Sequence, residues 1–464
     1  MRRLSGSDAR CAAGGSSLPL LLGGGSNRIV RSSLIMGSLL AVLQGGGLSV
    51  SADDWPQWRG PLRDGVWRET GIADRFEGGQ LPIRWRVAIK PGYAGPAVAE
   101  GRVFVTDRDR DKHTERVLCL DVGTGQLLWR HEYACTYGVS YDSGPRATPT
   151  VRDAKVYTLG AMGHLFCLDA CDGRILWTKD CVKDYRAPVP VWGFASAPLV
   201  DGERLIALIG GADTAAVVVF HKDTGREIWR SLSAREIGYC PPVIIEAGGT
   251  RQLIVWMPEE LCSLDPHSGE VHWRQPFHCE SGLSIATPIT DGHRLFVSTF
   301  YNGPLMLRLA ATRSAATVLW KGESDSELDT EKVHCLMSTP WLKDGYLYAV
   351  GGYGALRCLD AETGARVWET YQPTGNDRWW NAFLIPCGDR VFIANEQGEL
   401  ITARLSPKGY EELSRARLIE PTNRVRRRDV VWSHPAFANR HVFARNDKAI
   451  VCASLETAAS QPGR

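Results

Sequence analysis

The chain has 464 residues and a formal net charge of +2, from 54 basic and 52 acidic side chains. This near balance excludes the basic footprint of a nucleic-acid-binding protein, so no nucleic-acid partner is expected. A chain of 464 residues is long for one ordinary domain, and an internal repeat is therefore the first pattern to test.

Residues 1–52 have the pattern of an export signal. Arg28 and Arg31 precede an apolar run at residues 34–43, and small residues follow as far as Ala52. This order is typical of a signal peptide, with cleavage expected after Ala52. The apolar run is too short for a bilayer span, which needs about 20 residues. We expect an exported protein, periplasmic or extracellular, that is soluble after signal cleavage and does not span the membrane.

Residues 53–82 form a lead-in that is rich in Pro, Gly and Trp and contains the run Trp55-Pro-Gln-Trp-Arg-Gly-Pro61. Pro and Gly interrupt regular structure. We predict that the lead-in is an ordered but irregular strap lying on the surface. At the other end, residues 457–464 are expected to be a disordered tail.

From residue 83 onward the chain repeats one hairpin unit. Five copies place a Gly four residues before a Trp, and four of these five also place an Asp four residues before the Gly, as in Asp121, Gly125 and Trp129. Asp accepts hydrogen bonds from the backbone of a turn, and Gly supplies the positive φ of a tight hairpin. The Trp falls on the outgoing strand, where its ring can fill the space between neighbouring sheets. These Trp positions are 85, 129, 177, 229, 273, 320 and 368, and the copy ending at Trp320 has lost its Asp and Gly.

A second pattern lies between the Trp positions: a small residue or Pro, a strand, a polar turn and another strand. It starts eight times, at Gly95, Thr148, Ala197, Pro241, Thr287, Thr339, Ala382 and His434. Each unit therefore contains four short strands, which is the content of one propeller blade. The last unit, residues 434–455, lacks a Trp strand, whereas residues 82–88 form an orphan Trp strand before the first unit. We predict an all-β fold over residues 83–456: an eight-bladed β-propeller of four-stranded antiparallel blades, closed by this N-terminal strand. A seven-bladed ring is the alternative.

Twelve of the 13 cysteines follow the export signal. Cys119, Cys167 and Cys358 each directly precede Leu-Asp in the repeat, and we interpret them as small buried apolar residues. Because an exported protein permits disulfides, the cysteines of turns and loops are disulfide candidates whose pairing is open. These are Cys135, Cys171, Cys181, Cys240, Cys279 and Cys335.

With its repeated Leu-Asp-x-x-(Thr/Ser)-Gly-x-x-x-Trp turns, the chain resembles the pyrroloquinoline-quinone-like (PQQ-like) propeller repeat family. The resemblance covers nearly the whole chain after residue 52, and the lead-in run is similar to that of exported bacterial members. It implies one of two roles. Quinoprotein dehydrogenases hold the quinone and a calcium ion over the axis and oxidise alcohols or sugars, whereas other members are non-enzymatic scaffolds of the outer-membrane assembly machine. The chain has neither an adjacent cysteine pair nor a Cys-x-x-Cys-His haem site, which favours the non-enzymatic role.

The connections from each outer strand to the next blade are long and share one face, so their side chains are expected to form a funnel around the axis. The expected funnel residues are aromatic or polar: Tyr93, Arg146, Trp192, Phe194, Tyr239, Trp380, Asn381 and Trp432. A concave, mostly apolar site with convergent polar groups predicts ligand binding, and the alternative is aromatic packing of the loops. A basic cluster on the same face is interpreted as a solvated loop, or alternatively as a contact for an anionic ligand or partner. It consists of Arg424, Arg426, Arg427 and Arg428.

No metal site is expected, because no ligand spacing is recognisable. Oxygen ligands for calcium could come only from scattered residues on the funnel face, namely Asp142, Glu323, Asp325 and Asn381. The sequence predicts a monomeric binding or scaffolding module that takes a protein partner or a small ligand in the cell envelope. One alternative is a PQQ- and calcium-dependent alcohol or sugar dehydrogenase, with the quinone on Trp380 or Trp432 and Asp142 as a weak candidate for the base. Another is a carbohydrate-binding module, because aromatic rings also suit sugar faces.

Overall fold

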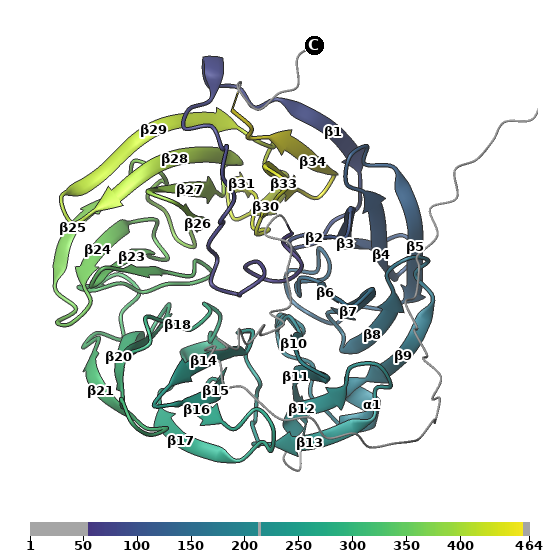
Figure 1. The fold of residues 1–464 in the computed structure, drawn as a ribbon, viewed down its shortest axis with the longest axis horizontal. Helices are drawn as coiled ribbons and strands as arrows, with labels where there is room; N and C mark the ends of the chain where they lie inside the picture. The colour runs from purple at the N-terminus through teal and green to yellow at the C-terminus, as the bar shows by residue number, and fades with distance from the viewer. Residues whose placement is uncertain (1–53, 212–214, 458–464) are drawn as a thin grey trace, which may run out of the picture. The chain divides into compact units, whose positions relative to one another are not determined.

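The computed structural model describes residues 54–211 and 215–457, which belong to one compact unit, Ser51–Arg464. Within these residues, eight four-stranded antiparallel sheets are arranged in a ring around an axis (Figure 1). The predicted eight-bladed propeller is therefore confirmed. The predicted export signal lies outside the described residues. None of the described helices is long and apolar enough to cross a bilayer.

Blades 1 to 7 follow the chain, and each has its four strands in order from the axis to the rim (Figure 1). Blade 1 consists of β2 (Ala97–Ala99), β3 (Arg102–Asp109), β4 (Thr114–Asp121) and β5 (Leu127–Ala134), and blade 2 of β6 (Thr150–Arg152), β7 (Lys155–Leu159), β8 (His164–Asp169) and β9 (Ile175–Asp180). Blade 3 consists of β10 (Leu199–Asp201), β11 (Arg204–Gly211), β12 (Ala215–His221) and β13 (Glu227–Ser231), and blade 4 of β14 (Val243–Ala247), β15 (Thr250–Trp256), β16 (Glu260–Leu264) and β17 (Val271–Pro276). Blade 5 consists of β18 (Ile289–Thr290), β19 (Arg294–Thr299), β20 (Gly303–Leu309) and β21 (Ala316–Lys321). Blade 6 consists of β22 (Trp341–Lys343), β23 (Tyr346–Val350), β24 (Leu356–Asp360) and β25 (Arg366–Thr370). Blade 7 consists of β26 (Ala382–Cys387), β27 (Arg390–Asn395), β28 (Glu399–Ser406) and β29 (Gly409–Arg417).

Blade 8 joins the two ends of the propeller. Its strands are β32 (Ala436–Ala438), β33 (His441–Arg445), β34 (Ala449–Ser454) and β1 (Ile83–Ala88). Strand β1 runs antiparallel to β34, with Trp85 opposite Cys452 and Val87 opposite Ile450. The predicted closure by the N-terminal strand is confirmed, and it leaves no gap in the ring where a blade would lack its outer strand.

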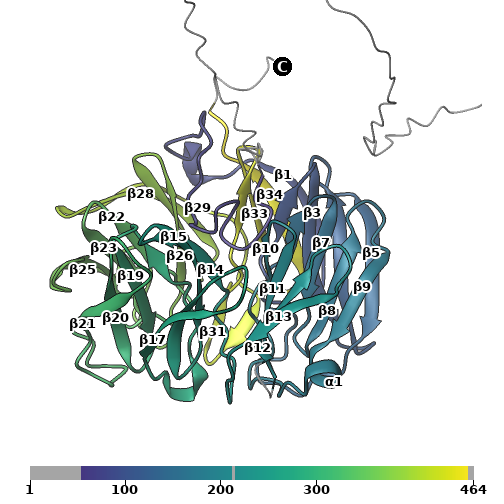
Figure 2. The same cartoon turned by 60° about the horizontal axis from the view of Figure 1, so that its bottom comes forward.

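Short elements lie in the connections between blades. They are helix α1 (Cys181–Tyr185), the 3-10 turns η1 (Glu77–Gly79) and η2 (Glu280–Gly282), and the hairpin of β30 (Asn423–Val425) and β31 (Arg428–Val430). Helix α1 and strand β31 lie on one face of the ring, whereas the lead-in lies on the opposite face (Figure 2).

The repeated turn has the predicted chemistry. Asp121 Oδ1 accepts hydrogen bonds from the backbone N–H of Gly123 and Thr124, at 3.1 and 2.8 Å, and from the Thr124 hydroxyl at 2.8 Å. Gly125 has a φ of 73°, which a residue with a Cβ rarely adopts. These local bonds define the path of the chain from the third strand of the blade into the outer strand.

The repeated Trp locks most blades to the turn of the next blade. The Trp129 ring of blade 1 lies against Gly173 of blade 2, where an added Cβ would be 2.4 Å from the ring, and Trp129 Nε1 donates to Ala170 O at 2.9 Å. Four further Trp side chains donate to a backbone carbonyl of the next blade: Trp85 to Val122, Trp177 to Lys222, Trp320 to Ala361 and Trp368 to Ser406. The Gly of the repeat therefore serves both the turn and the space for the neighbouring ring.

Blade 5 shows what happens when the turn is lost. Its copy of the repeat has neither the Asp nor the Gly, so Trp273 of blade 4 has no such turn to contact. Trp273 Nε1 instead donates to Gln252 Oε1 of its own blade at 3.0 Å, and the ring is half-buried. The interface between blades 4 and 5 thus lacks the lock that Trp129 provides between blades 1 and 2.

The lead-in is irregular, as predicted, but it does not simply lie on the surface. Trp55 and Trp67 are each only 2% exposed. Trp55 forms a β-bridge with Val98, and the Trp67 N–H donates to Pro386 O at 2.8 Å. The lead-in passes over the centre of the ring (Figure 1), and its Trp55 and Trp67 rings pack against Phe437 of blade 8, at 6.0 and 5.2 Å between ring centres. The strap is therefore anchored by buried aromatic rings. At the C-terminus, the Thr457 N–H donates to Gly71 O at 3.0 Å, so the first residue of the expected tail is hydrogen-bonded.

All twelve cysteines in the described residues are free thiols. Cys119, Cys167 and Cys358 are fully buried, which confirms their interpretation as apolar core residues. The six turn and loop cysteines are also unpaired, and the interpretation of these residues as disulfide candidates is wrong for this structure. Burial raises the pKa of the Cys279 and Cys335 thiols to about 12, so both remain protonated and apolar at neutral pH.

Candidate functional site

A cavity of about 320 Å³ lies on the propeller axis. All eight connections between successive blades contribute to its lining, and each supplies an aromatic ring or a long apolar side chain. One lining residue from each connection, in chain order, is Tyr93, Tyr141, Trp192, Tyr239, Leu283, Met337, Trp379 and Trp432. We call this cavity the funnel. It is walled by large apolar surfaces, as ligand cavities in proteins usually are.

Five of the eight predicted funnel residues line the cavity: Tyr93, Arg146, Trp192, Tyr239 and Trp432. The sequence therefore placed part of the cavity lining correctly, and the role of these residues in binding stays a prediction. The other three predicted residues are buried behind the wall, each for a reason that can be seen in its contacts.

Phe194 is 1% exposed and packs against Gly163, where an added Cβ would be 2.9 Å from the ring. Asn381 is fully buried, and its side-chain oxygen accepts a hydrogen bond from Ser338 Oγ at 2.7 Å. Trp380 is 6% exposed, and its neighbour Trp379 lines the cavity in its place. Trp379 has a φ of 68°, in the left-handed region, and the Trp380 ring packs on Gly375, where an added Cβ would be 2.4 Å from the ring.

Two residues at the axial end of the funnel were not predicted. Trp58, from the lead-in, and His434, which precedes β32, both line the cavity, and their rings lie 5.0 Å apart. Trp58 Nε1 donates to Thr287 Oγ1 at 2.8 Å. Because these residues come from the lead-in and from the start of an inner strand, they form the floor of the funnel.

Arg146 is the one cation among the described lining residues. Its guanidinium donates to the carbonyl oxygens of Ser140, Tyr141 and Gly144, and it lies 5.2 Å from the centre of the Tyr93 ring. Burial lowers the pKa of Arg146, although the group remains charged at neutral pH. The bonds to loop carbonyls fix the position of the charge without neutralising it.

One buried carboxylate, that of Glu115, influences the charge of Arg146 although its own hydrogen bonds go to other residues. Glu115 is fully buried and accepts hydrogen bonds from the hydroxyls of Tyr133 and Tyr137 and from the Ala161 N–H. Its charge raises the pKa of Arg146 through space, against the larger lowering that burial causes. Arg146 therefore gives the funnel a positive local charge.

His434 is neutral at physiological pH. It is 5% exposed, and burial together with the charge of Arg59 lowers its pKa from 6.5 to about 3. Its Nδ1 lies 2.6 Å from Pro435 O, so Nδ1 carries the proton and donates to that carbonyl. The remaining ring nitrogen, Nε2, is then a hydrogen-bond acceptor.

A buried carboxylate holds Trp432 in the wall. Glu396 is 1% exposed and accepts hydrogen bonds from Trp432 Nε1 at 2.9 Å and from Arg428 Nε at 2.6 Å. Burial raises the pKa of Glu396, and the bond from Arg428 opposes that rise. Arg428 is thus a structural member of the predicted basic cluster, whereas Arg426 is exposed and stacks over the Trp379 ring at 5.6 Å.

The predicted oxygen ligands do not meet in the funnel. None of Asp142, Glu323, Asp325 and Asn381 lines the cavity, and no described lining residue is an Asp or a Glu. Asp142, the weak candidate for a base, forms ion pairs with Arg108 at 3.0 Å and Arg110 at 2.9 Å. The described residues of the funnel therefore lack the carboxylates that usually hold calcium.

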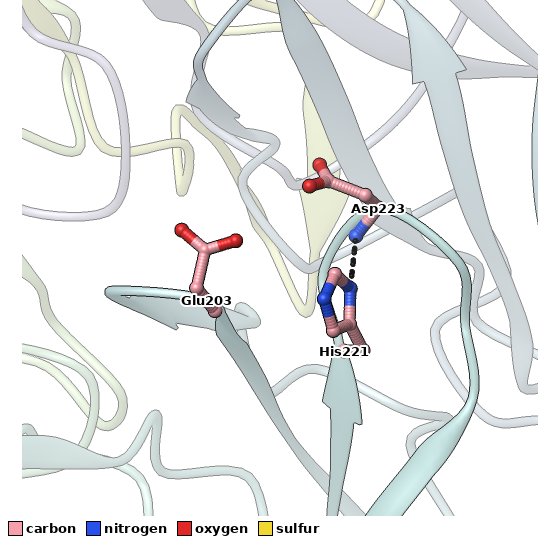
Figure 3. Close-up of side chains that lie close together, drawn as sticks. All are labelled: Glu203, His221 and Asp223. Carbon is pink, nitrogen blue, oxygen red and sulfur yellow. Dashed lines mark hydrogen bonds between the residues drawn. The ribbon is translucent and has the colours of Figure 1, made fainter.

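A separate cluster of possible metal ligands lies at the hairpin turns of blade 3. Glu203, His221 and Asp223 have ligand atoms within 4.8 Å of one another, and the Asp223 N–H donates to His221 Nδ1 at 3.2 Å (Figure 3). Two lysines neutralise its carboxylates: Lys222 Nζ lies 3.0 Å from Glu203, and Lys155 Nζ lies 3.0 Å from Asp223. These contacts account for the cluster as a set of surface ion pairs.

Comparison with known proteins gives two kinds of relative. A family model described as outer membrane protein assembly factor BamB matches residues 113–370 and 213–461. A quinoprotein ethanol dehydrogenase of Pseudomonas aeruginosa is 26% identical over 219 residues, which are 41% of this chain and 34% of that protein. The outer membrane protein assembly factor BamB of Moranella endobia is 25% identical over 255 residues, which are 52% of this chain and 61% of that protein. This chain thus matches only part of the length of each relative.

Solved structures show the same architecture. The quinohemoprotein alcohol dehydrogenase from Comamonas testosteroni has a TM-score of 0.60 at 13% identity, covering 89% of this chain and 82% of that chain. BamB from Moraxella catarrhalis has a TM-score of 0.56 at 13% identity, covering 81% of this chain and 99% of that chain. At this level of identity the likeness concerns the fold.

Proposed function

Because this chain belongs to the family described as outer membrane protein assembly factor BamB, we propose that it is a binding module of the cell envelope whose funnel takes a small, planar, anionic ligand. The observation that carries the proposal is the funnel itself: about 320 Å³ of space with aromatic walls and, among its described lining residues, one cation and no carboxylate. Planar rings suit such walls, and a negative charge suits Arg146.

The hydrogen bonds of Arg146 support an anionic ligand. Arg445, by contrast, is fully buried away from the funnel, and its Nε and both terminal nitrogens donate to the carbonyls of Lys90, Thr106 and Asn446. Arg146 uses only its terminal nitrogens for loop carbonyls and also borders open space. A cation fixed in an apolar cavity attracts an anion more strongly than the same cation would in water.

The test compares two fluorescent probes that share one ring system. 8-Anilinonaphthalene-1-sulfonate is anionic, whereas N-phenyl-1-naphthylamine lacks the sulfonate, and both gain fluorescence in apolar sites. We expect the wild-type protein to bind the anionic probe about tenfold more tightly, which corresponds to about 1.4 kcal/mol. Arg146→Met should remove this preference and leave the binding of the neutral probe nearly unchanged.

Arg424→Met is the matched control, because Arg424 lies on the same face, is exposed, and is paired with Asp429 at 3.0 Å. This variant should retain the preference for the anionic probe. If neither probe binds the wild-type protein, the funnel is not a binding site for small planar molecules. If Arg146→Met keeps the preference, the anionic part of the proposal is wrong.

A second candidate function is a quinoprotein dehydrogenase, which the names of several relatives suggest. The aromatic walls suit a quinone, whereas the lack of carboxylates among the described lining residues does not suit its calcium ion. Titration with pyrroloquinoline quinone, with and without calcium, followed by dye-linked oxidation of alcohols and sugars, separates the candidates. Calcium-dependent turnover would replace the binding-module proposal.

A further inference from the structure

The floor of the funnel is made by a segment that precedes the first blade. Trp58 lines the cavity, although it belongs to the lead-in, which lies on the face of the ring opposite to α1 (Figure 2). The rest of the wall comes from the connections between blades and from Phe383 of β26. The lead-in therefore reaches the cavity from the other end of the axis.

The lead-in is anchored to several blades around Trp58. Trp55 bridges to Val98 in blade 1, and Trp58 Nε1 donates to Thr287 Oγ1 just before blade 5. Arg63 donates to Pro242 O, just before blade 4, at 2.8 Å. It also donates to the carbonyls of Ala197 and Pro198, just before blade 3. Burial lowers the pKa of Arg63 to about 9, which shows how far this anchor is withdrawn from water. Trp58 is thus held in place by contacts from separate parts of the ring.

The three lead-in tryptophans differ in a way that points to the role of Trp58. Trp55 and Trp67 are 2% exposed and lie in the hydrophobic core. Trp58 is half-buried, and it lines the cavity. A ring that served only as part of the core would be buried like the other two, because burial of its whole apolar surface stabilises the fold more than partial burial does. The exposed part of Trp58 is surface that a ligand can cover.

We propose that Trp58 is a ligand-contacting residue and that the lead-in, through Trp58, is an integral part of the binding site and sets the depth to which a ligand enters. This inference rests on the proposed function of the funnel and adds a residue and a segment to it. It has a thermodynamic consequence, because a ligand that contacts Trp58 binds only when the lead-in is docked. Ligand binding must therefore stabilise the docked lead-in.

The first measurement is the affinity of N-phenyl-1-naphthylamine for Trp58→Leu. Loss of the aromatic floor should weaken binding about tenfold, since an aromatic contact and its buried area are both removed. Trp67→Leu is the matched control: it removes a Trp of the same segment that does not line the cavity. It should lower the unfolding temperature and leave the affinity within about twofold of wild type. If Trp58→Leu fails to fold, Trp58→Phe, which retains a ring, should bind with intermediate affinity.

The second measurement is hydrogen exchange of the lead-in with and without the same probe. The N–H of Trp55 bonds to Val98 O at 2.8 Å and that of Trp67 bonds to Pro386 O at 2.8 Å, so both report docking of the lead-in onto the blades. The probe should slow their exchange in the wild-type protein and have little effect in Trp58→Leu. Wild-type affinity in Trp58→Leu, or exchange that the probe leaves unchanged in wild type, would overturn the inference while leaving the funnel as a binding site. Failure of the wild-type protein to bind either probe would instead reject the proposed function, and this inference with it.

Discussion

The rim and the axis of the propeller use the same residue type in different ways. At the rim, Trp129 packs on Gly173 and donates to Ala170 O in the next blade, and the same contact recurs around the ring. At the axis, each ring has its own support: Trp432 donates to Glu396 and Trp58 donates to Thr287. The Trp–Gly contact at the rim is encoded by the repeated sequence and stabilises the ring. The hydrogen bonds of Trp432 and Trp58 are encoded separately, outside the repeat, and they determine the shape of the funnel. The following predictions test this division, beginning with the largest expected effect.

Trp129→Ala should lower the free energy of unfolding by about 4 kcal/mol, because it removes a large buried ring from the interface of blades 1 and 2. Trp273→Ala should cost clearly less, since Trp273 is half-buried and its neighbouring blade lacks the Gly turn. Denaturation in guanidinium chloride measures both. Equal losses would mean that the lock between Trp and Gly has no special role at the rim.

Gly173→Ala should cost about 3 kcal/mol, from the positive φ of 74° and from overlap with the Trp129 ring. Gly202→Ala is the matched control, because Gly202 has a φ of 57° and nothing within 4 Å of an added Cβ. It should cost only about 1 kcal/mol. If the two substitutions cost the same, the requirement for Gly at the rim is conformational alone.

The axis should show its own dependence on pH. An unfolded histidine titrates near pH 6.5, whereas folded His434 is protonated only near pH 3. The unfolded state therefore binds the extra proton first, so stability falls as pH decreases from 6.5 towards 3. His434 should account for a loss of about 2 kcal/mol between pH 7 and pH 5. The difference in stability between wild type and His434→Gln, measured at both pH values, isolates this contribution, and a difference that is independent of pH would contradict it.

The smallest effect on stability is expected at the funnel wall. Trp432→Phe removes the donor to Glu396 and retains a ring, so it should cost about 1 to 2 kcal/mol. Its binding of N-phenyl-1-naphthylamine should weaken by about two- to fivefold, because the wall loses a fixed orientation. A rim variant such as Trp129→Phe should leave probe binding unchanged while the protein is folded, and the comparison of these two variants completes the test.

The sequence predicted the rim better than the axis. The spacing of Asp121, Gly125 and Trp129 is set by local turn chemistry, and it recurs often enough to give the blade count and the closure by β1. Five funnel residues were found because the connections between blades must meet at the axis. The choice between Trp379 and Trp380 is made in an irregular loop, where Trp379 has a positive φ and Trp380 packs on Gly375, and no periodicity encodes it. Trp58 was missed because its path across the axis depends on contacts with residues more than two hundred positions away, such as Thr287.

The pairing of β1 with β34 also constrains the order of events during synthesis. Strand β1 is synthesised first but cannot pair until the last three strands have been made, since its sheet is completed by β32, β33 and β34. A chain that ends before β34 leaves Ile83–Ala88 without a partner, as an unpaired strand open to aggregation. Only a chain that includes β34 can therefore pair β1 and protect that strand from chaperones and proteases.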